Sequence, residues 1–268
     1  MPRYICTTCG AQFAETEQPP GACTICTDQR QYVGWGGQQW TTLDQLRRTH
    51  RNAIKEEESG LISIGTEPSF GIGQRAFLLR RPGGNILWDC VSLFDGGLAD
   101  LINGIGGISA IAISHPHYYA TMVEWANAFS CPVLLHVADR QWVMQPDERI
   151  EFWEGESKGL LGGLTLIRCG GHFEGGTVLH WPEGSDGKGV LLCGDVIQVV
   201  QDRQWVSFMY SYPNFIPLRA SSVQRIVEAV EPFEFDRIYG AFWGMVVIED
   251  GKAVVRRSAE RYVRAITE

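Results

Sequence analysis

Three histidines and one aspartate are spaced as metal ligands often are. His115 and His117 follow the apolar run at residues 108–113, His172 lies in a glycine-rich turn, and Asp195 ends the run Leu-Leu-Cys-Gly-Asp. Polar side chains at the ends of buried strands can meet at one sheet edge. Three imidazoles and a carboxylate suit zinc, or iron or manganese, and leave a position open for water. Each histidine could instead be a hydrogen-bonded core residue, but four such placements together favour a metal site.

A second group of metal-binding residues lies near the N-terminus. Two C-x-x-C pairs, Cys6 with Cys9 and Cys23 with Cys26, are separated by a short segment that is poor in apolar residues. Each pair can deliver two thiolates from one tight turn, and zinc prefers four such ligands. Because so short a segment lacks a core, metal binding would supply its folding free energy. We therefore expect a zinc ribbon here (or an iron site of the rubredoxin type), rather than disulfides or free thiols.

The elements that carry these residues alternate in type along the chain. We expect a ribbon-like segment over residues 1–40, a connecting helix within 41–60 and one larger domain over 61–268. Short apolar runs bounded by glycine-rich turns predict strands, and spacings of three and four predict helices. The predicted strands are 61–64, 76–79, 86–89, 110–113, 133–136, 164–167, 177–181, 190–193, 237–239 and 245–249, and the predicted helices are 42–58, 98–104, 121–129, 138–144, 221–230 and 258–266.

Four segments, in this order, resemble the metallo-β-lactamase fold superfamily. They are residues 86–89 (an early strand ending in aspartate), 115–120 (the H-x-H-x-D-H motif), 171–172 (the loop of the third histidine) and 194–195 (the metal-bridging aspartate). The resemblance covers about residues 60–250, and more narrowly the chain is similar to members that carry a zinc ribbon. It implies an α/β (α+β) fold, an αββα sandwich with a site along one edge. It also implies that His115, His117 and His172 hold a first metal and that Asp195 is the carboxylate shared with a second.

The chain departs from this pattern at the second metal. Tyr119 and Ala120 replace the aspartate and histidine that end the H-x-H-x-D-H motif. The last histidine of the family pattern is also missing, since no histidine follows His180. A second metal would keep only Asp195, so we expect a mononuclear site.

The leading hypothesis for function is a metal-dependent hydrolase acting on a small-molecule ester, thioester or amide. One metal on His115, His117 and His172 can lower the pKa of a water molecule, with Asp195 as the general base. Tyr119 is a second candidate catalytic residue, because its hydroxyl could stabilise an oxyanion. The candidate substrate-binding residues are Tyr118, His136 and Tyr210.

Two other classes of function stay open. Two histidines and a carboxylate form the facial ligand set of mononuclear Fe(II) oxygenases. His115, His172 and Asp195 match the iron ligands of the persulfide dioxygenases in the same superfamily, which predicts iron and a thiol substrate. Loss of the second-site residues fits, alternatively, a non-catalytic binding protein on a degenerate fold, with the ribbon as a docking module.

Composition limits the partners and the compartment. The net charge of −8 argues against nucleic acid as a partner, because nucleic-acid binders are generally basic. No segment is long and apolar enough to span a membrane, and no signal peptide begins the chain, so we expect a cytoplasmic protein. The aromatic run at residues 205–213 fits a pocket wall, ordinary packing or the surface of a homodimer equally well.

Overall fold

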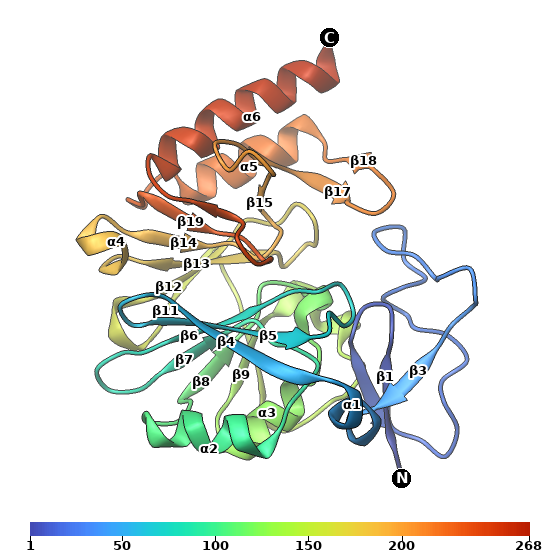
Figure 1. The fold of residues 1–268 in the computed structure, drawn as a ribbon. Coiled ribbons are helices and arrows are strands. Elements are labelled where there is room, and N and C mark those ends of the chain that lie inside the picture. Colours follow the sequence, from blue (N-terminus) through green and yellow to red (C-terminus); the bar gives the residue numbers. More distant parts are fainter.

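The larger of two stacked sheets is formed by the first half of the chain, in a computed structural model that describes residues 1–268 (Figure 1). Its strand order is β10-β9-β8-β7-β6-β5-β4. The strands are β4 (Arg51–Glu58), β5 (Leu61–Glu67), β6 (Ala76–Leu79), β7 (Ile86–Trp88), β8 (Ala110–Ala112), β9 (Val133–His136) and β10 (Ile150–Trp153). From β7 to β10 the pairing is parallel, and the remaining pairs are antiparallel.

The second sheet comes from the C-terminal half and has the order β11-β12-β13-β14-β19-β20. Its strands are β11 (Ser157–Gly159), β12 (Thr165–Arg168), β13 (Thr177–Trp181), β14 (Val190–Leu192), β19 (Arg237–Tyr239) and β20 (Val246–Val247). Two small strand pairs lie beside it, β15 (Gln198–Val199) with β16 (Val206–Ser207) and β17 (Met209–Ser211) with β18 (Ile216–Pro217).

Aromatic and aliphatic side chains from both sheets fill the space between them. Phe77 and Trp88 of the larger sheet belong to the same buried cluster as Leu166, Leu179 and Trp181 of the second. Strands buried on both faces carry near-continuous apolar runs, which is why these strands were recognisable in the sequence.

Helices cover the outer face of each sheet, as Figure 1 shows. α2 (Gly96–Gly104) and α3 (Met122–Phe129) pack on the larger sheet, and α5 (Ala220–Val230) and α6 (Gly251–Thr267) pack on the second. The short helices are α4 (Gly184–Gly187), η1 (Pro116–Tyr118), η2 (Val137–Trp142) and η3 (Leu161–Gly163). The order helix, sheet, sheet, helix confirms the predicted αββα sandwich.

The N-terminal segment forms a small three-stranded sheet of its own. Its strands are β1 (Arg3–Cys6), β2 (Gln12–Glu15) and β3 (Trp40–Thr42), in the order β2-β1-β3. The backbone N–H of Gln12 donates to the carbonyl of Ala120 at 2.9 Å, and the Ser92 hydroxyl donates to the carbonyl of Gly10 at 2.9 Å. The ribbon segment is therefore joined directly to the loop that carries His115 and His117.

The predicted connecting helix over residues 42–58 is wrong in its second half. Helix α1 covers only Leu43–Thr49, with Thr42 as its N-cap, and Arg51–Glu58 is strand β4. Charged residues dominate β4 and gave it a helical character in the sequence. Pairing with β5 along nearly its whole length overrides that local preference. The αββα part consequently begins near Arg51 rather than at residue 61.

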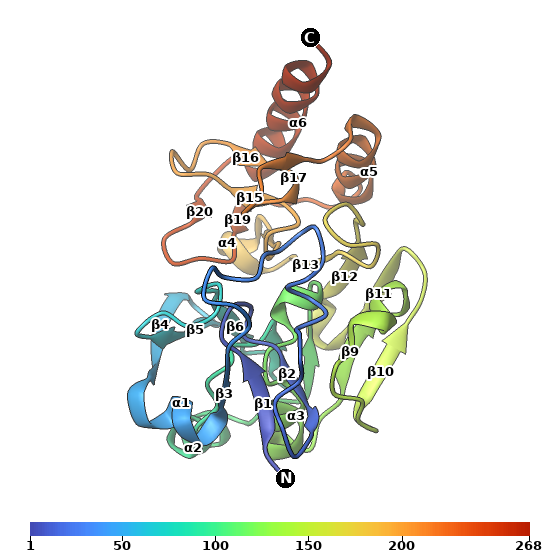
Figure 2. The ribbon, with the colours of Figure 1, turned by 90° about the vertical axis from the view of Figure 1, so that its right-hand side faces the viewer.

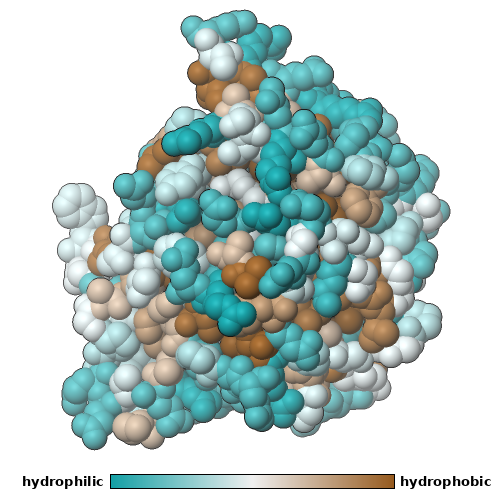
Figure 3. Space-filling view, turned by 180° about the vertical axis from the view of Figure 1, so that it is seen from behind, coloured by the Kyte–Doolittle hydropathy of each residue, from teal (hydrophilic) through white to brown (hydrophobic).

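Two further details concern the C-terminal end and the surface. Helix α6 begins at Gly251, two turns earlier than predicted, because residues 251–257 join the face that packs on the second sheet. No helix is long and apolar enough to cross a membrane. Seen from behind, the surface is mostly hydrophilic, with apolar side chains gathered near the middle of that face (Figure 3).

Candidate metal centre

The four residues that the sequence singled out meet at one point of the sandwich edge. His115 follows β8, His117 lies in η1, His172 follows β12, and Asp195 follows β14. All four are buried, and their potential ligand atoms lie within 4.8 Å of one another. The two sheets thus bring together residues up to 80 positions apart, as the resemblance implied.

Three polar atoms of this cluster have no hydrogen-bond partner. Nε2 of His115 lies 2.9 Å from Oδ1 of Asp195, close enough for an ion pair, yet neither atom has a hydrogen-bond partner. Nε2 of His117 is also buried and unpartnered, and its Nδ1 lies 3.2 Å from Nε2 of His172. Buried polar atoms without partners are costly, so unpartnered atoms in a cluster of potential ligands favour a cation site. The residues therefore fit a single divalent metal ion.

Neighbouring groups fix the direction of two of the imidazoles. Nδ1 of His172 lies 2.8 Å from the carbonyl oxygen of Tyr210, and Nδ1 of His115 lies 3.0 Å from the hydroxyl of Ser114. A carbonyl only accepts, so Nδ1 of His172 carries the proton and Nε2 presents its lone pair to the cluster. Hydrogen bonds of this kind orient metal ligands in many proteins.

Glycine is required beside two of the ligands. Gly194 has a φ of +53°, and a Cβ there would stand 2.8 Å from the Ser114 hydroxyl oxygen. Gly171 has a φ of +85°, and a Cβ there would stand 2.8 Å from Ile226. Only glycine combines this backbone conformation with such close approach, so both turns depend on it to deliver Asp195 and His172.

Burial keeps the three imidazoles neutral. It lowers the pKa of His115 to about 3 and that of His172 to about 4, and it holds the pKa of His117 well below its usual range. The positive charge of Arg30 lowers all three values further. Neutral imidazole is the form that binds metals, so the cluster is ready to do so at neutral pH.

Asp89 is the aspartate that ends the early strand of the family pattern, and it holds the loop that carries His115. Its Oδ1 accepts the backbone N–H of Ser114 at 2.8 Å, directly before His115. Burial raises the pKa of Asp89 to about 8, and the charge of Asp195 adds to this shift. The carboxyl group is therefore largely protonated at neutral pH, and its role here is to hold the His115 loop.

Ala120, which stands where the family pattern has a second-metal histidine, is packed in the core. Ala120 and Ala241 both belong to the buried cluster between the larger sheet and its helices. Close by in the sequence, the carbonyl of Gly240 accepts a hydrogen bond at 3.2 Å from the fully buried guanidinium of Arg75, which pairs with Glu57 at 2.7 Å. The methyl side chain of Ala120 offers no ligand to a second ion.

No protein-family model matches this chain. The Bacillus subtilis (strain 168) protein YmaE, described as uncharacterized, is 53% identical over 268 residues, which cover 99% of this chain and 97% of YmaE. The chain belongs to the YmaE family.

Solved structures with similar folds are metallo-β-lactamases. DIM-1 matches with a TM-score of 0.60 and 13% identity over 81% of this chain and 99% of its own. FIM-1 from Pseudomonas aeruginosa, in its mono-zinc form, matches at 0.61 and 14% over 81% and 97%. SMB-1 in complex with mercaptoacetic acid matches at 0.52 and 19% over 78% and 95%. At these identities the likeness establishes the fold alone, and this YmaE relative has the metallo-β-lactamase fold.

The candidate residues Tyr118 and Tyr119 differ in where their hydroxyl groups lie. The Tyr118 hydroxyl is buried and has no hydrogen-bond partner. After burial, the charges of Asp195 and Asp89 contribute most to raising its pKa, which places it beside the cluster. Tyr119 instead directs its hydroxyl to the backbone carbonyl of Asp139, at 3.4 Å, and this placement gives no support to the catalytic role predicted for it.

His136 and Tyr210 differ in how they lie relative to the cluster. Both ring nitrogens of His136 are taken by the backbone, Nδ1 by the N–H of Ala138 and Nε2 by the carbonyl of Gly155, each at 3.2 Å, which favours a structural role over the predicted substrate contact. Tyr210 contributes its carbonyl, which accepts from His172, and its ring lies 4.8 Å from the guanidinium carbon of Arg30.

Two residues at the cluster were missed by the sequence analysis. Phe173 is buried, and its ring centroid lies 5.0–5.4 Å from those of all three histidine ligands. Arg30, from the ribbon segment, also packs on Phe173, with its guanidinium carbon 4.5 Å from the Phe173 centroid. Phe173 follows His172 directly and could have been suspected, whereas nothing near Arg30 in the sequence signals its position.

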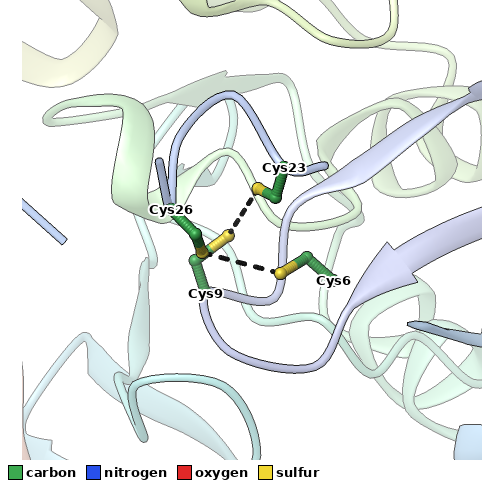
Figure 4. Close-up of side chains that lie close together, drawn as sticks. All are labelled: Cys6, Cys9, Cys23 and Cys26. Carbon is green, nitrogen blue, oxygen red and sulfur yellow. Dashed lines mark hydrogen bonds between the residues drawn. The ribbon is translucent and has the colours of Figure 1, made fainter. Parts of the chain in front are cut away.

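The four N-terminal cysteines form a second metal-capable cluster, shown in Figure 4. All are buried and free, and their sulfur atoms lie within 4.8 Å of one another. The sulfur–sulfur distances are 3.6 Å for Cys6 and Cys26 and 3.7 Å for Cys9 and Cys23, too long for disulfides. Four thiols gathered in this way fit a tetrahedral metal ion.

Proposed function

We propose that this protein is a metal-dependent hydrolase that uses a single ion, held by His115, His117 and His172 with Asp195, against a small-molecule ester, thioester or amide. The observation that supports it most is that these four buried residues bring their potential ligand atoms within 4.8 Å of one another, while Nε2 of His115, Nε2 of His117 and Oδ1 of Asp195 have no hydrogen-bond partner. A divalent ion held there supplies Lewis acidity, which lowers the pKa of water and polarises a carbonyl group. Zinc is the ion that we propose for this cluster and for the four cysteines, on the basis of their donor atoms.

The residues of the chain supply the rest of the chemistry. Asp195 faces the same point as the imidazoles and is positioned there to accept a proton from water. The Tyr212 hydroxyl donates to the Asp195 carbonyl at 2.8 Å and so holds the backbone of this residue in place. Tyr118 keeps its proton, because burial raises its pKa well above the usual range, and it can donate a hydrogen bond to a developing oxyanion.

One specific feature favours a second candidate function. His115, His172 and Asp195 form a two-histidine, one-carboxylate group. That ligand set is typical of Fe(II) oxygenases, so an iron-dependent oxidation of a thiol or persulfide is the alternative to hydrolysis. Iron in the purified protein and oxygen consumption with thiol substrates would favour this alternative.

The metal content per chain tests the proposal. Elemental analysis should find two ions per chain in the wild type and one in His115→Ala. His180→Ala is the matched control, because His180 is also buried but bonds to the carbonyl of Glu234, and it should keep two ions. One ion in both the wild type and His115→Ala would contradict a metal at the histidines. A panel of esters, thioesters and amides, assayed with the metal-loaded protein, then tests hydrolysis itself.

A further inference from the structure

The ribbon segment reaches across to the second sheet beside the histidine cluster. The loop after the second cysteine pair lies close to β17 in Figure 2. The Ser211 hydroxyl donates to the carbonyl of Arg30 at 3.1 Å, and the Asn214 side chain donates to the carbonyls of Gln29 and Gln31, each at 3.0 Å. Three hydrogen bonds to three consecutive carbonyls fix this loop in place, so the position of Arg30 is set by both parts of the protein.

The Arg30 side chain points toward the metal cluster. Its guanidinium carbon lies 4.5 Å from the ring centroid of Phe173, 4.8 Å from that of Tyr210 and 5.7 Å from that of Trp142. Phe173 contacts all three histidine ligands, so the guanidinium and the histidines share one aromatic neighbour. The Arg30 side chain is 15% exposed.

One edge of the guanidinium has no partner. Nη1 donates to Oδ1 of Asp28 at 2.8 Å, whereas Nε is buried and has no hydrogen bond. No acceptor lies at Nη2 either, so the edge formed by Nε and Nη2 is free. Two parallel N–H groups on this edge match the two oxygens of a carboxylate or a phosphoryl group.

A cation in this position is unfavourable for metal binding alone. Arg30 packs on the same Phe173 ring as all three imidazoles, so its charge also opposes a divalent ion held by them. Asp28 offsets only part of this repulsion. An anionic group held by the guanidinium beside the metal would be attracted by both positive charges.

We propose that Arg30 binds an anionic group of the substrate, a carboxylate or a phosphoryl group, beside the histidine cluster, so that the ribbon contributes directly to substrate recognition. This inference rests on the proposed metal at the histidines. Without a substrate role, Arg30 would act only as an anchor that holds the ribbon against Phe173 and Tyr210. The two roles differ in whether the charge on the ligand matters.

Thiol probes of different charge distinguish these roles, because a thiolate binds a zinc ion directly. We would measure the affinities of 3-mercaptopropionate, (2-mercaptoethyl)phosphonate and the uncharged 3-mercaptopropionamide for the metal-loaded full-length protein by calorimetry. The proteins are the wild type and Arg30→Met, which keeps an apolar chain against the aromatic rings but removes the charge. Arg261→Met is the matched control, because Arg261 also stacks on an aromatic ring, that of Trp205 at 3.7 Å, on helix α6.

We expect only Arg30→Met, and not Arg261→Met, to lose the preference for anionic probes over the uncharged amide. Arg30→Met should weaken binding of at least one anionic probe by about 10- to 100-fold, and binding of the amide by less than about 2-fold. The probe with the larger loss identifies carboxylate or phosphoryl as the preferred group. Equal ratios of anion to amide affinity in Arg30→Met and the wild type would overturn the proposal. If no probe binds the wild type and only one ion is present per chain, the proposed function fails first, and this inference fails with it.

A second variant covers the case in which Arg30→Met does not fold. Arg30→Lys keeps the charge but loses the paired N–H groups, so it should retain only part of the preference for the anionic probes. If Arg30→Lys kept the full preference for the anionic probes, the paired N–H groups would not be needed, and the proposed bidentate contact would be wrong. Two ions per chain after the titration confirm that the probes have not removed the metals.

Discussion

Nε2 of His115 and Oδ1 of Asp195 lie 2.9 Å apart, yet they do not form a hydrogen bond with each other or with any other group. Two buried polar atoms at this distance normally satisfy each other. Here both point to a third position, which they share with His117 and His172. This pair therefore distinguishes a ligand set from a group of core histidines.

The first prediction concerns Asp195. Asp195→Asn keeps the shape of the side chain but removes its charge. Loss of a group that only orients a ligand typically lowers metal affinity by about 10- to 100-fold. Because Asp195 is proposed as a ligand itself, the histidine cluster should lose more than about 100-fold in metal affinity. Titration with a competing chelator measures the loss. Asp139→Asn is the control, since Asp139 is also buried but accepts the backbone N–H of Gly175. Equal metal affinity in Asp195→Asn and the wild type would remove Asp195 from the site.

The second prediction separates the two adjacent tyrosines. Tyr118→Phe removes a buried hydroxyl without a partner, so the free energy of unfolding should stay the same or rise by up to about 1 kcal/mol. If Tyr118 donates to an oxyanion, the same change should lower kcat by about 100-fold or more on the substrate found in the panel. Tyr119→Phe, whose hydroxyl meets the Asp139 carbonyl, should change kcat by less than about 2-fold. A larger loss in Tyr119→Phe than in Tyr118→Phe would restore the role first predicted for Tyr119.

The metal ligands could be predicted from the sequence because each follows a largely apolar strand by three to five residues. His115 and Asp195 come after strands that are buried on both faces, and such strands are visible as apolar runs. Strand β4 could not be predicted in this way. Its charged residues resemble an exposed helix, and only its pairing with β5 makes it a strand.

Arg30 shows a different limit of the sequence. It lies more than 80 positions from His115, its ion-pair partner Asp28 is local, and its contacts with Phe173 and Tyr210 are entirely tertiary. Nothing in the ribbon sequence indicates which way its loop turns. The ribbon could therefore be recognised by its cysteines, while its part in the site required the fold.

The third prediction uses the raised pKa of Asp89. The pKa is about 8 in the folded protein and about 3.9 in an unfolded chain, so the folded state holds a proton that the unfolded state loses. The contribution of this group to stability is complete below about pH 4 and is lost as the pH rises through about 8. Asp89→Asn cannot titrate and can still accept the Ser114 N–H. Its stability relative to the wild type should therefore rise between about pH 4 and pH 8.

Urea unfolding of the metal-free proteins at several pH values checks this difference. Comparing the two proteins cancels the opposite contribution of the buried histidines, whose lowered pKa values favour folding at higher pH. A difference in unfolding free energy that stays constant from pH 4 to pH 8 would show that Asp89 is ionised in the folded state.

The fourth prediction concerns the ribbon metal. Cys9→Ser removes one of four thiolates from a segment whose buried core has only seven residues, four of them the cysteines themselves. Metal binding contributes about 10–16 kcal/mol to the folding of zinc-finger peptides, so the segment should not fold without its ion. Limited proteolysis should then cut within residues 1–42, and elemental analysis should find at most one ion per chain.

The αββα part has its own three cores and should survive this change. Cys131→Ser is the matched control, because Cys131 is buried in the core under helix α3 and away from both clusters, and it should keep two ions and resist cleavage. Because the ribbon positions Arg30, Cys9→Ser should also lose the preference for anionic thiols that Arg30→Met loses. Retention of protease resistance in Cys9→Ser, with one ion lost, would mean that the segment folds without a metal and is held by its contacts with the αββα part, among them those with Ala120, Ser92 and Ser211.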